Sequence, residues 1–310
     1  MKCTILLDGR FCDPTKFEQS YSQSPDPFHS SVSEVHIIIG ERASFLINAI
    51  LRLLCLCNQL AKLGKQVTLE FKYTGTNSAY SYFNRCGFFE QLNLGVAVAP
   101  CRPEQSLAEL LRGQSESLME IKTIRPSNNE RAYNRMIPHE VTAIVRAQLR
   151  GSFSSLVDDL QTILSETCGN IPEHSSSTEV GYVLVQRYKK SGTIFVAISD
   201  SGVGLLNSLR EGMRARGNND YRLNDNELIL KVIREGLSRL DDPGRGTGLP
   251  RVAELSIKYN VTMHLRLENL DAELVPDGNE YSAIASFNKP LNTLKGTHIS
   301  LVMNENAITC

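Results

Sequence analysis

Four short segments in the second half of the chain carry residue types that could do chemistry. The first, LSETCGN, places Glu166 and Asn170 four residues apart, which puts both side chains on one face of a helix. A carboxylate can accept a proton from water or from a hydroxyl group, and an amide oxygen is a fitting ligand for Mg²⁺. An exposed polar helix face would show the same pattern, so the meaning of this segment depends on the other three.

The second segment, AISDSGVGL, ends an apolar strand on Asp200 and continues with Gly202 and Gly204. An ionised carboxylate only accepts hydrogen bonds, so Asp200 can accept one from the amino group of adenine, whereas guanine presents an oxygen at that position. The two glycines allow a tight turn with positive φ. A plain turn from strand to loop is the alternative.

The third segment, GRGTGL, runs into LPRVAELSIKYN, whose apolar spacing predicts a helix. Gly244, Gly246 and Gly248 would then lie at a helix N-terminus, where free backbone N–H groups and the helix dipole favour a phosphate. Many helices also follow a glycine-rich turn without binding an anion.

The fourth segment, LKGTHISLVM, opens a terminal alternating strand with Gly296 and Thr297. The hydroxyl group of Thr297 could bond adenine, or a water molecule beside Asp200. An ordinary β-turn followed by a strand is the alternative interpretation.

Taken in order, the four segments form a more specific series than any one of them alone. The series consists of Glu-x-x-x-Asn on a helix, DxGxG after a strand, GxGxGL before a helix and Gly-Thr before a strand. Together these motifs resemble the GHKL ATP-binding fold. DNA gyrase, the heat-shock chaperone ATPase, mismatch-repair ATPases, histidine kinases and anti-sigma serine kinases share this fold. The resemblance covers residues 131–310 and implies a two-layer α/β sandwich that binds Mg-ATP, with helices on one face of a mixed sheet.

The resemblance also implies which residues act on the phosphates and the metal. Asn170 would bind Mg²⁺, and Glu166 would stand at the position of the general base. The sequence departs from the family pattern directly afterwards, because Pro172 removes an N–H that would bond to the carbonyl group of Cys168. We therefore expect the helix to kink or end near Asn170.

The nucleotide contacts follow from the same resemblance. Asp200 would hold the adenine in a pocket shaped by Gly202 and Gly204, and Thr297 would support that contact. The glycine-rich segment would contact the phosphates through Gly244, Arg245, Gly246, Thr247 and Gly248.

Residues 205–243 form a long, charged stretch, and because long loops in compact domains are often lids, the resemblance implies a lid over the nucleotide. Arg239 or Arg245 would reach the γ-phosphate.

The branch of the family is suggested by residues around Asn170. The stretch NIPEHSS resembles the anti-sigma serine kinases, in which Glu166 would deprotonate a substrate serine. His174 and Ser175 are equally typical of a surface loop. His139 lies too close to Asn170 to be the acceptor of a histidine kinase and is interpreted as an ordinary helix residue.

The first half of the chain predicts a separate small α/β unit. A strand at VHIIIG, a helix from about Ala43 to Leu63, a strand at QVTLEFKY and a helix opening near Ser78 follow a polar lead-in at residues 13–33, which we expect to be a loop. The order loosely resembles a STAS domain, the fold of anti-sigma antagonists, whose phosphoacceptor serine would fall near Thr76 or Ser78. An unrelated α/β module that binds a partner is the alternative.

The composition and charge of the chain indicate which broad classes of protein fit the sequence. The formal net charge of −1 gives no indication of a nucleic-acid partner, and eight scattered cysteines without a CxxC pair or a signal peptide indicate reduced thiols in the cytoplasm. The apolar stretch at residues 45–61 is interrupted by Arg52 and is too short to span a membrane, so it predicts a buried helix.

The sequence thus predicts an α/β protein with a STAS-like domain at residues 1–105, a linker at 106–130 and a GHKL domain at 131–310. We expect a cytoplasmic regulator that binds ATP and Mg²⁺ and acts on a protein partner, with phosphoryl transfer to a serine or threonine as one activity. A nucleotide-gated interaction protein with little turnover and a slow dimeric ATPase are the alternatives.

Overall fold

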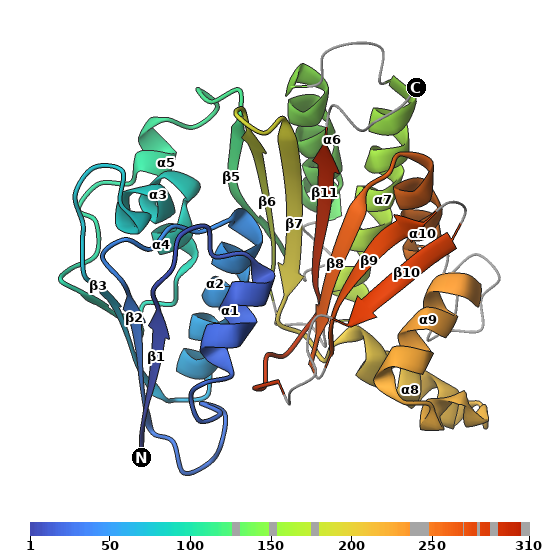
Figure 1. The fold of residues 1–310 in the computed structure, drawn as a ribbon, viewed down its shortest axis with the longest axis horizontal. Helices are drawn as coiled ribbons and strands as arrows, with labels where there is room; N and C mark the ends of the chain where they lie inside the picture. The colour runs from blue at the N-terminus through green and yellow to red at the C-terminus, as the bar shows by residue number, and fades with distance from the viewer. Residues whose placement is uncertain are drawn as a thin grey trace.

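The computed structural model describes residues 1–125, 131–148, 154–174, 180–235, 248–268, 270–277, 280–285 and 291–304. Their strands form two sheets, a parallel sheet of four strands and an antiparallel sheet of seven (Figure 1). The predicted α/β class is confirmed at this level.

The parallel sheet belongs to the first third of the chain. Its strands follow one another in the order β1-β2-β3-β4, and their bounds are β1 Lys2–Leu7, β2 Glu34–Ile39, β3 Gln66–Phe71 and β4 Ala97–Ala99. Along the first three strands buried residues alternate with residues that are partly or fully exposed. One face of the sheet is therefore packed and the other faces solvent. Three short helices follow β3: α3 Ala79–Cys86, α4 Phe88–Gln91 and α5 Leu107–Leu110.

Helix α2, Ile47–Lys62, lies between the two sheets (Figure 1). Nearly all of its residues are buried, Arg52 and Gln59 included. A helix that is apolar around most of its circumference is expected where both sides are covered. The buried helix predicted from the apolar stretch is confirmed, and it forms a common layer of the two halves.

The polar lead-in is not a loop, because helix α1 spans Pro14–Tyr21 within it. Asp13 caps this helix by accepting a hydrogen bond from the backbone N–H of Lys16 at 2.8 Å. Phe17 and Tyr21 are fully buried. A cap, a proline at the first helical position and two aromatic residues four apart thus turn a polar stretch into an amphipathic helix.

The seven-stranded sheet has the order β10-β9-β8-β11-β7-β6-β5, and every neighbouring pair is antiparallel. Its strands are β5 Leu118–Ile124, β6 Gly181–Tyr188, β7 Thr193–Asp200, β8 Thr262–Leu267, β9 Leu270–Asp277, β10 Glu280–Ala285 and β11 His298–Asn304. The expected mixed sheet is wrong, because β7 and β8 run in the same direction but β11 inserts between them, antiparallel to both. Strand β5 lies within the segment predicted as a linker, so this sheet begins before residue 131.

Helices cover both faces of this sheet. Helices α6 Arg131–Gln148, α7 Ser154–His174 and α10 Gly248–Lys258 pack on one face, and α1 and α2 pack on the other (Figure 1). Helix α7 continues to His174, so it does not end at Asn170, and a kink there stays a prediction. Pro172 lies in the last turn, where it removes one hydrogen bond, and buried Leu164 and Cys168 hold the preceding turns against the core.

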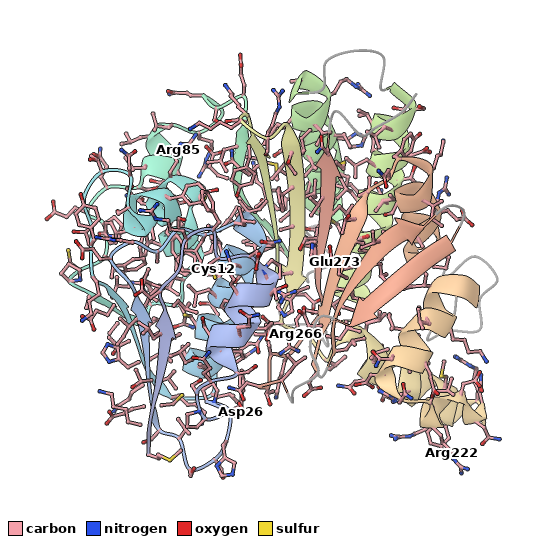
Figure 2. The ribbon with its side chains drawn as sticks, in the orientation of Figure 1. Cys12, Asp26, Arg85, Arg222, Arg266 and Glu273 are labelled. Carbon is pink, nitrogen blue, oxygen red and sulfur yellow. The ribbon has the colours of Figure 1, made fainter. Side chains whose placement is uncertain are left out.

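A buried cluster of charges joins α1 and α2 to the antiparallel sheet. Glu18 Oε1 accepts hydrogen bonds from Arg52 Nη1 and from Arg266 Nε, each at 2.9 Å, and Arg52 Nη2 donates to Asp271 Oδ1 at 2.8 Å. None of the four side chains is more than 3% exposed. Figure 2 shows Arg266 between α1 and the strands. Two cations and two anions leave the cluster neutral, which is the condition for burying charge at tolerable cost.

Among the helices that the structure describes, none has the length and apolar character needed to cross a membrane.

Candidate functional site

The candidate site lies where β7 ends and β11 begins. The strands pair in a register that sets His298 opposite Ser199, and the backbone N–H of Asp200 donates to the carbonyl oxygen of Thr297 at 3.0 Å. Two of the four segments singled out in the sequence are therefore neighbours in space, although they lie far apart along the chain.

Gly296 is required by the close approach of these segments. Its φ is +95°, and a Cβ atom built on it would lie 2.0 Å from the carbonyl oxygen of Asp200. Gly204 has φ +79°, and a Cβ there would lie 3.4 Å from the carbonyl oxygen of Gly296. Both positions adopt a backbone conformation that favours glycine, and the first also leaves no room for a side chain.

Two polar side chains are fixed at this junction. Asp200 Oδ1 accepts a hydrogen bond from the backbone N–H of Gly202 at 2.7 Å, and Thr297 Oγ1 accepts one from the N–H of Leu205 at 3.2 Å. Leu205 opens helix α8, Leu205–Ala215, so the threonine satisfies an N–H that has no partner within the helix. A carboxylate that accepts and a hydroxyl group that keeps a proton to donate are thus held on adjoining backbone segments.

This pair matches the polar edge of adenine. The base offers an amino group as donor beside a ring nitrogen as acceptor, so it needs one acceptor and one donor from the protein. Asp200 can supply the first and Thr297 the second, and both side chains are partly exposed. One acceptor and one donor at the junction are thus compatible in chemistry with the nucleobase that the sequence suggested.

The remaining predicted site residues are only partly described. Glu166 and Asn170 lie in α7, and their side chains are outside the described part of the structure. Gly248 is the first residue of α10, so the predicted helix does start at the end of the glycine-rich segment. Outside the described residues lie Gly244, Arg245, Gly246, Thr247, Ser175 and Arg239.

The segment predicted as a long lid loop is largely helical where it is described. Helix α8 is followed by a 3₁₀ turn at Asn219–Arg222 and by helix α9, Asp225–Glu235. Arg210 holds this arrangement together, because its guanidinium pairs with Asp225 at 2.6 Å and donates to the carbonyl oxygens of Tyr221 and Leu223. Leu206, Leu209 and Met213 of α8 are buried in the main core, so the described part is a packed helical pair.

Residues of the N-terminal half hold the segment that leads into β11. Tyr21 donates its hydroxyl to the carbonyl oxygen of Thr293 at 2.6 Å, and Asn292 Nδ2 donates to the carbonyl oxygens of Tyr21 and Ser24. Thr293 donates its hydroxyl to Asp26 at 2.6 Å. The sequence analysis did not find these residues, because no local pattern marks a contact between the two ends of the chain.

Of the two candidate phosphoacceptors in the first half, Thr76 is exposed and Ser78 is buried. Ser78 is 6% exposed and caps helix α3 by accepting a hydrogen bond from the N–H of Ser81 at 3.1 Å. Its burial argues against modification of the folded protein at this serine.

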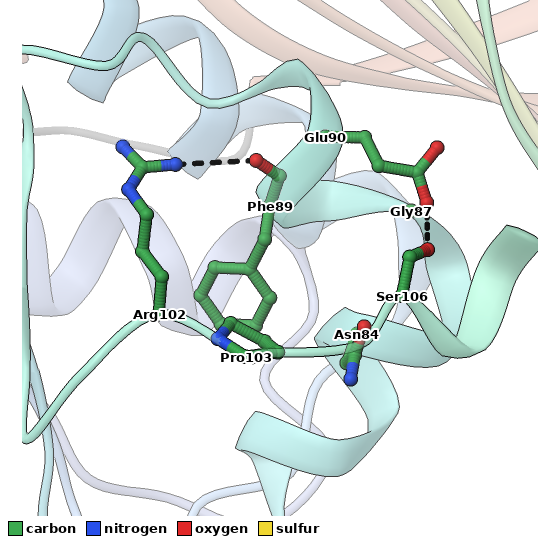
Figure 3. Close-up of a pocket in the computed structure, with 7 residues that line it drawn as sticks. All are labelled: Asn84, Gly87, Phe89, Glu90, Arg102, Pro103 and Ser106. Carbon is green, nitrogen blue, oxygen red and sulfur yellow. Dashed lines mark hydrogen bonds between the residues drawn. The ribbon is translucent and has the colours of Figure 1, made fainter.

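A surface pocket of about 120 Å³ lies beside α4 (Figure 3). Arg102 lines it and donates to the carbonyl oxygens of Phe89, Leu92, Asn93 and Val96. The hydroxyl of Ser106, also in the lining, donates to the carboxylate of Glu90. These polar groups stabilise the loop around them, so the pocket shows no sign of a dedicated ligand.

The thiols and carboxylates that the structure describes form no group of three or more able to hold a metal ion. None of the seven cysteines in the described part of the chain forms a disulfide bond. Burial raises the pKa of the thiols of Cys12, Cys57, Cys86 and Cys168 to about 12, which keeps them protonated and unreactive at neutral pH.

Comparison with known proteins gives no relative: no family model matches the chain, and no curated protein matches it.

Proposed function

We propose that this chain is an intracellular ATP-binding regulator of the GHKL type, with its adenine site at the junction of β7 and β11. The observation that carries the proposal is the junction itself, where the backbones of Asp200 and Thr297 are hydrogen-bonded and the adjoining Gly296 leaves no room for a side chain without a shift. The order of the four sequence segments supports it independently. Described cysteines that form no disulfide bond are in keeping with a reducing compartment.

The phosphate and metal contacts are proposed from the resemblance. Asn170 would hold Mg²⁺, which would neutralise charge on the phosphates, and the segment ending at Gly248 would donate backbone N–H groups to them. Glu166 would accept the proton of a serine or threonine hydroxyl on a protein partner.

A second candidate function is nucleotide-gated partner binding without turnover. The contacts of Tyr21 and Asn292 favour it, because they connect the N-terminal half directly to the segment beside the adenine site. A change at that segment on nucleotide binding would be transmitted to α1.

The adenine site is tested by titrating ATP and GTP into the wild-type protein and the Asp200→Asn variant. We expect the wild type to bind ATP in preference to GTP. The variant should bind ATP about tenfold more weakly or worse, and its preference should shrink because an amide can donate to the guanine oxygen. Asp158→Asn is the control, since Asp158 is 70% exposed on α7. Unchanged ATP affinity in Asp200→Asn would exclude this pocket.

Turnover is tested by ADP release from Mg-ATP, with Glu166→Ala beside the wild type. Release by the wild type that is lost in the variant indicates an enzyme with Glu166 as its base. Release that survives in the variant shows that the base assignment is wrong. ATP binding without ADP release favours the nucleotide-gated function.

A further inference from the structure

Gln59 of helix α2 contacts both backbone segments of the candidate adenine site. Its side-chain Nε2 donates to Ser201 Oγ at 3.1 Å and to the carbonyl oxygen of Lys295 at 2.9 Å, and its Oε1 accepts from the N–H of Lys295 at 3.1 Å. Gln59 is 7% exposed. Ser201 directly follows Asp200, and Lys295 directly precedes Gly296.

An amide is suited to this position because it offers a donor and an acceptor at once. Gln59 satisfies both the N–H and the C=O of Lys295, as a neighbouring strand would, and its third hydrogen bond reaches the turn after β7. One buried side chain therefore fixes the separation of two segments that adjoin different strands.

The separation of the two segments matters because their backbones are already closely packed at the junction. A Cβ atom on Gly296 would lie only 2.0 Å from the carbonyl oxygen of Asp200, so the two backbones are already as close as a glycine permits. A small shift of Lys295 would move Thr297 relative to Asp200, and polar groups that must meet one base lose affinity when displaced by about 1 Å.

We propose that Gln59 is a positioning residue of the adenine site, through which the N-terminal half sets the affinity of the C-terminal half for ATP. Gln59 touches neither Asp200 nor Thr297 in the described hydrogen bonds and acts through Ser201 and Lys295. The inference rests on the proposed function, since the ligand it positions for is ATP.

The neighbouring residue Asn58 provides a matched control. Its Nδ2 donates to the carbonyl oxygen of Gln91 at 2.9 Å and to the hydroxyl of Tyr182 at 3.0 Å, and its Oδ1 accepts from the N–H of Asn93 at 2.8 Å. Asn58→Ala therefore removes as many hydrogen bonds from the same helix as Gln59→Ala does, without touching the junction.

The experiment measures ATP and GTP affinity of the full chain in the wild type, Gln59→Ala and Asn58→Ala, together with hydrogen exchange of the nucleotide-free proteins. We expect Gln59→Ala to bind ATP about tenfold more weakly than Asn58→Ala and to discriminate less against GTP. The amides of Asp200 and Leu205, which donate to Thr297, should exchange faster in Gln59→Ala only.

If Gln59→Ala does not fold, Gln59→Glu is compared with Asn58→Asp. Gln59→Glu keeps the side-chain size and the bond from the N–H of Lys295 but turns a carboxylate toward the carbonyl oxygen of that residue, so ATP affinity should again fall.

The outcomes separate this inference from the proposed function. Wild-type protein that binds no ATP overturns both. The positioning role is overturned if Gln59→Ala binds ATP as tightly as the wild type does. It is also overturned if the two alanine variants show equal ATP affinity and equal hydrogen exchange. Either result leaves the adenine site standing.

Discussion

The two faces of the seven-stranded sheet differ in chemistry along β8, β9 and β11. Toward α6, α7 and α10 the side chains are apolar, and residues such as Met263, Leu265 and Leu301 join the larger core cluster. Toward α1 and α2 the alternate positions carry His264, Arg266, Asp271, Glu273, His298 and Ser300. One sheet thus buries an apolar layer on one side and a charged layer on the other.

The apolar face and the charged face contribute differently to the packing of the sheet. Apolar contacts are non-directional and tolerate small shifts, so the helical face stabilises the sheet without fixing its partner to a particular register. Charge pairs lose most of their energy when the partners move apart, so we expect the charged face to fix where α1 and α2 lie. The same helices carry Tyr21 and Gln59, which hold the segment leading into β11.

The largest expected difference in stability is between two substitutions that keep the size of the side chain, one for each face. Glu18→Gln leaves the charge of Arg52 and Arg266 only partly compensated by Asp271 and should lower the free energy of unfolding by about 3–5 kcal/mol. Leu301→Met on the apolar face keeps volume and should cost less than about 1.5 kcal/mol. Urea unfolding of both variants measures the contrast. Equal losses would show that the two faces do not differ as described.

A smaller loss of stability is expected from a substitution of Gly296, where the charged face meets the segment leading into β11. Gly296→Ala must adopt a positive φ and displace the carbonyl group of Asp200, so we expect a loss of about 2–3 kcal/mol. Gly217→Ala also has positive φ, at +69°, but a Cβ there has no neighbour within 4 Å, so about 1 kcal/mol is expected.

Comparing these two glycine variants separates the cost of the steric clash with Asp200 from the cost of the positive φ. Thermal unfolding measures stability, and ATP titration should show loss of binding in Gly296→Ala alone. Equal thermal shifts in the two variants would mean that the Asp200 and Gly296 segments can separate at little cost.

Local patterns predict single elements, including α2 on the charged face, but they do not predict the contacts among the charged residues of that face. The buried helix α2, the strand ending on Asp200 and the helix starting at Gly248 follow from periodicity and glycine placement, which neighbouring residues determine. A loop is predicted at helix α1 although the Asp13 cap and the aromatic pair are local signals; only the burial of Glu18 depends on Arg52 and Arg266, which lie far away in the sequence. The antiparallel order was missed for the same reason, since the insertion of β11 depends on its pairing with both β7 and β8.

The smallest effect concerns the histidines of the charged face. His298 is fully enclosed, and burial, with Arg52 and Arg266 nearby, lowers the pKa of its ring well below 6.5. Burial also lowers the pKa of His264, against the opposing charge of Glu273. The unfolded chain binds protons on these rings below about pH 6.5, while the folded protein keeps them neutral to lower pH. The unfolded state therefore takes up more protons in this interval, and the stability present above pH 6.5 falls as the pH drops.

Each such histidine contributes up to about 1.4 kcal/mol of lost stability per pH unit below 6.5, until its folded-state pKa is reached. Urea unfolding at pH 7.5 and 5.5 measures this slope. His298→Gln should reduce the slope even if it lowers stability at both pH values, because a glutamine takes up no proton. His139→Gln, which replaces an exposed histidine on α6, is the control. An unreduced slope in His298→Gln would show that His298 does not cause the acid sensitivity.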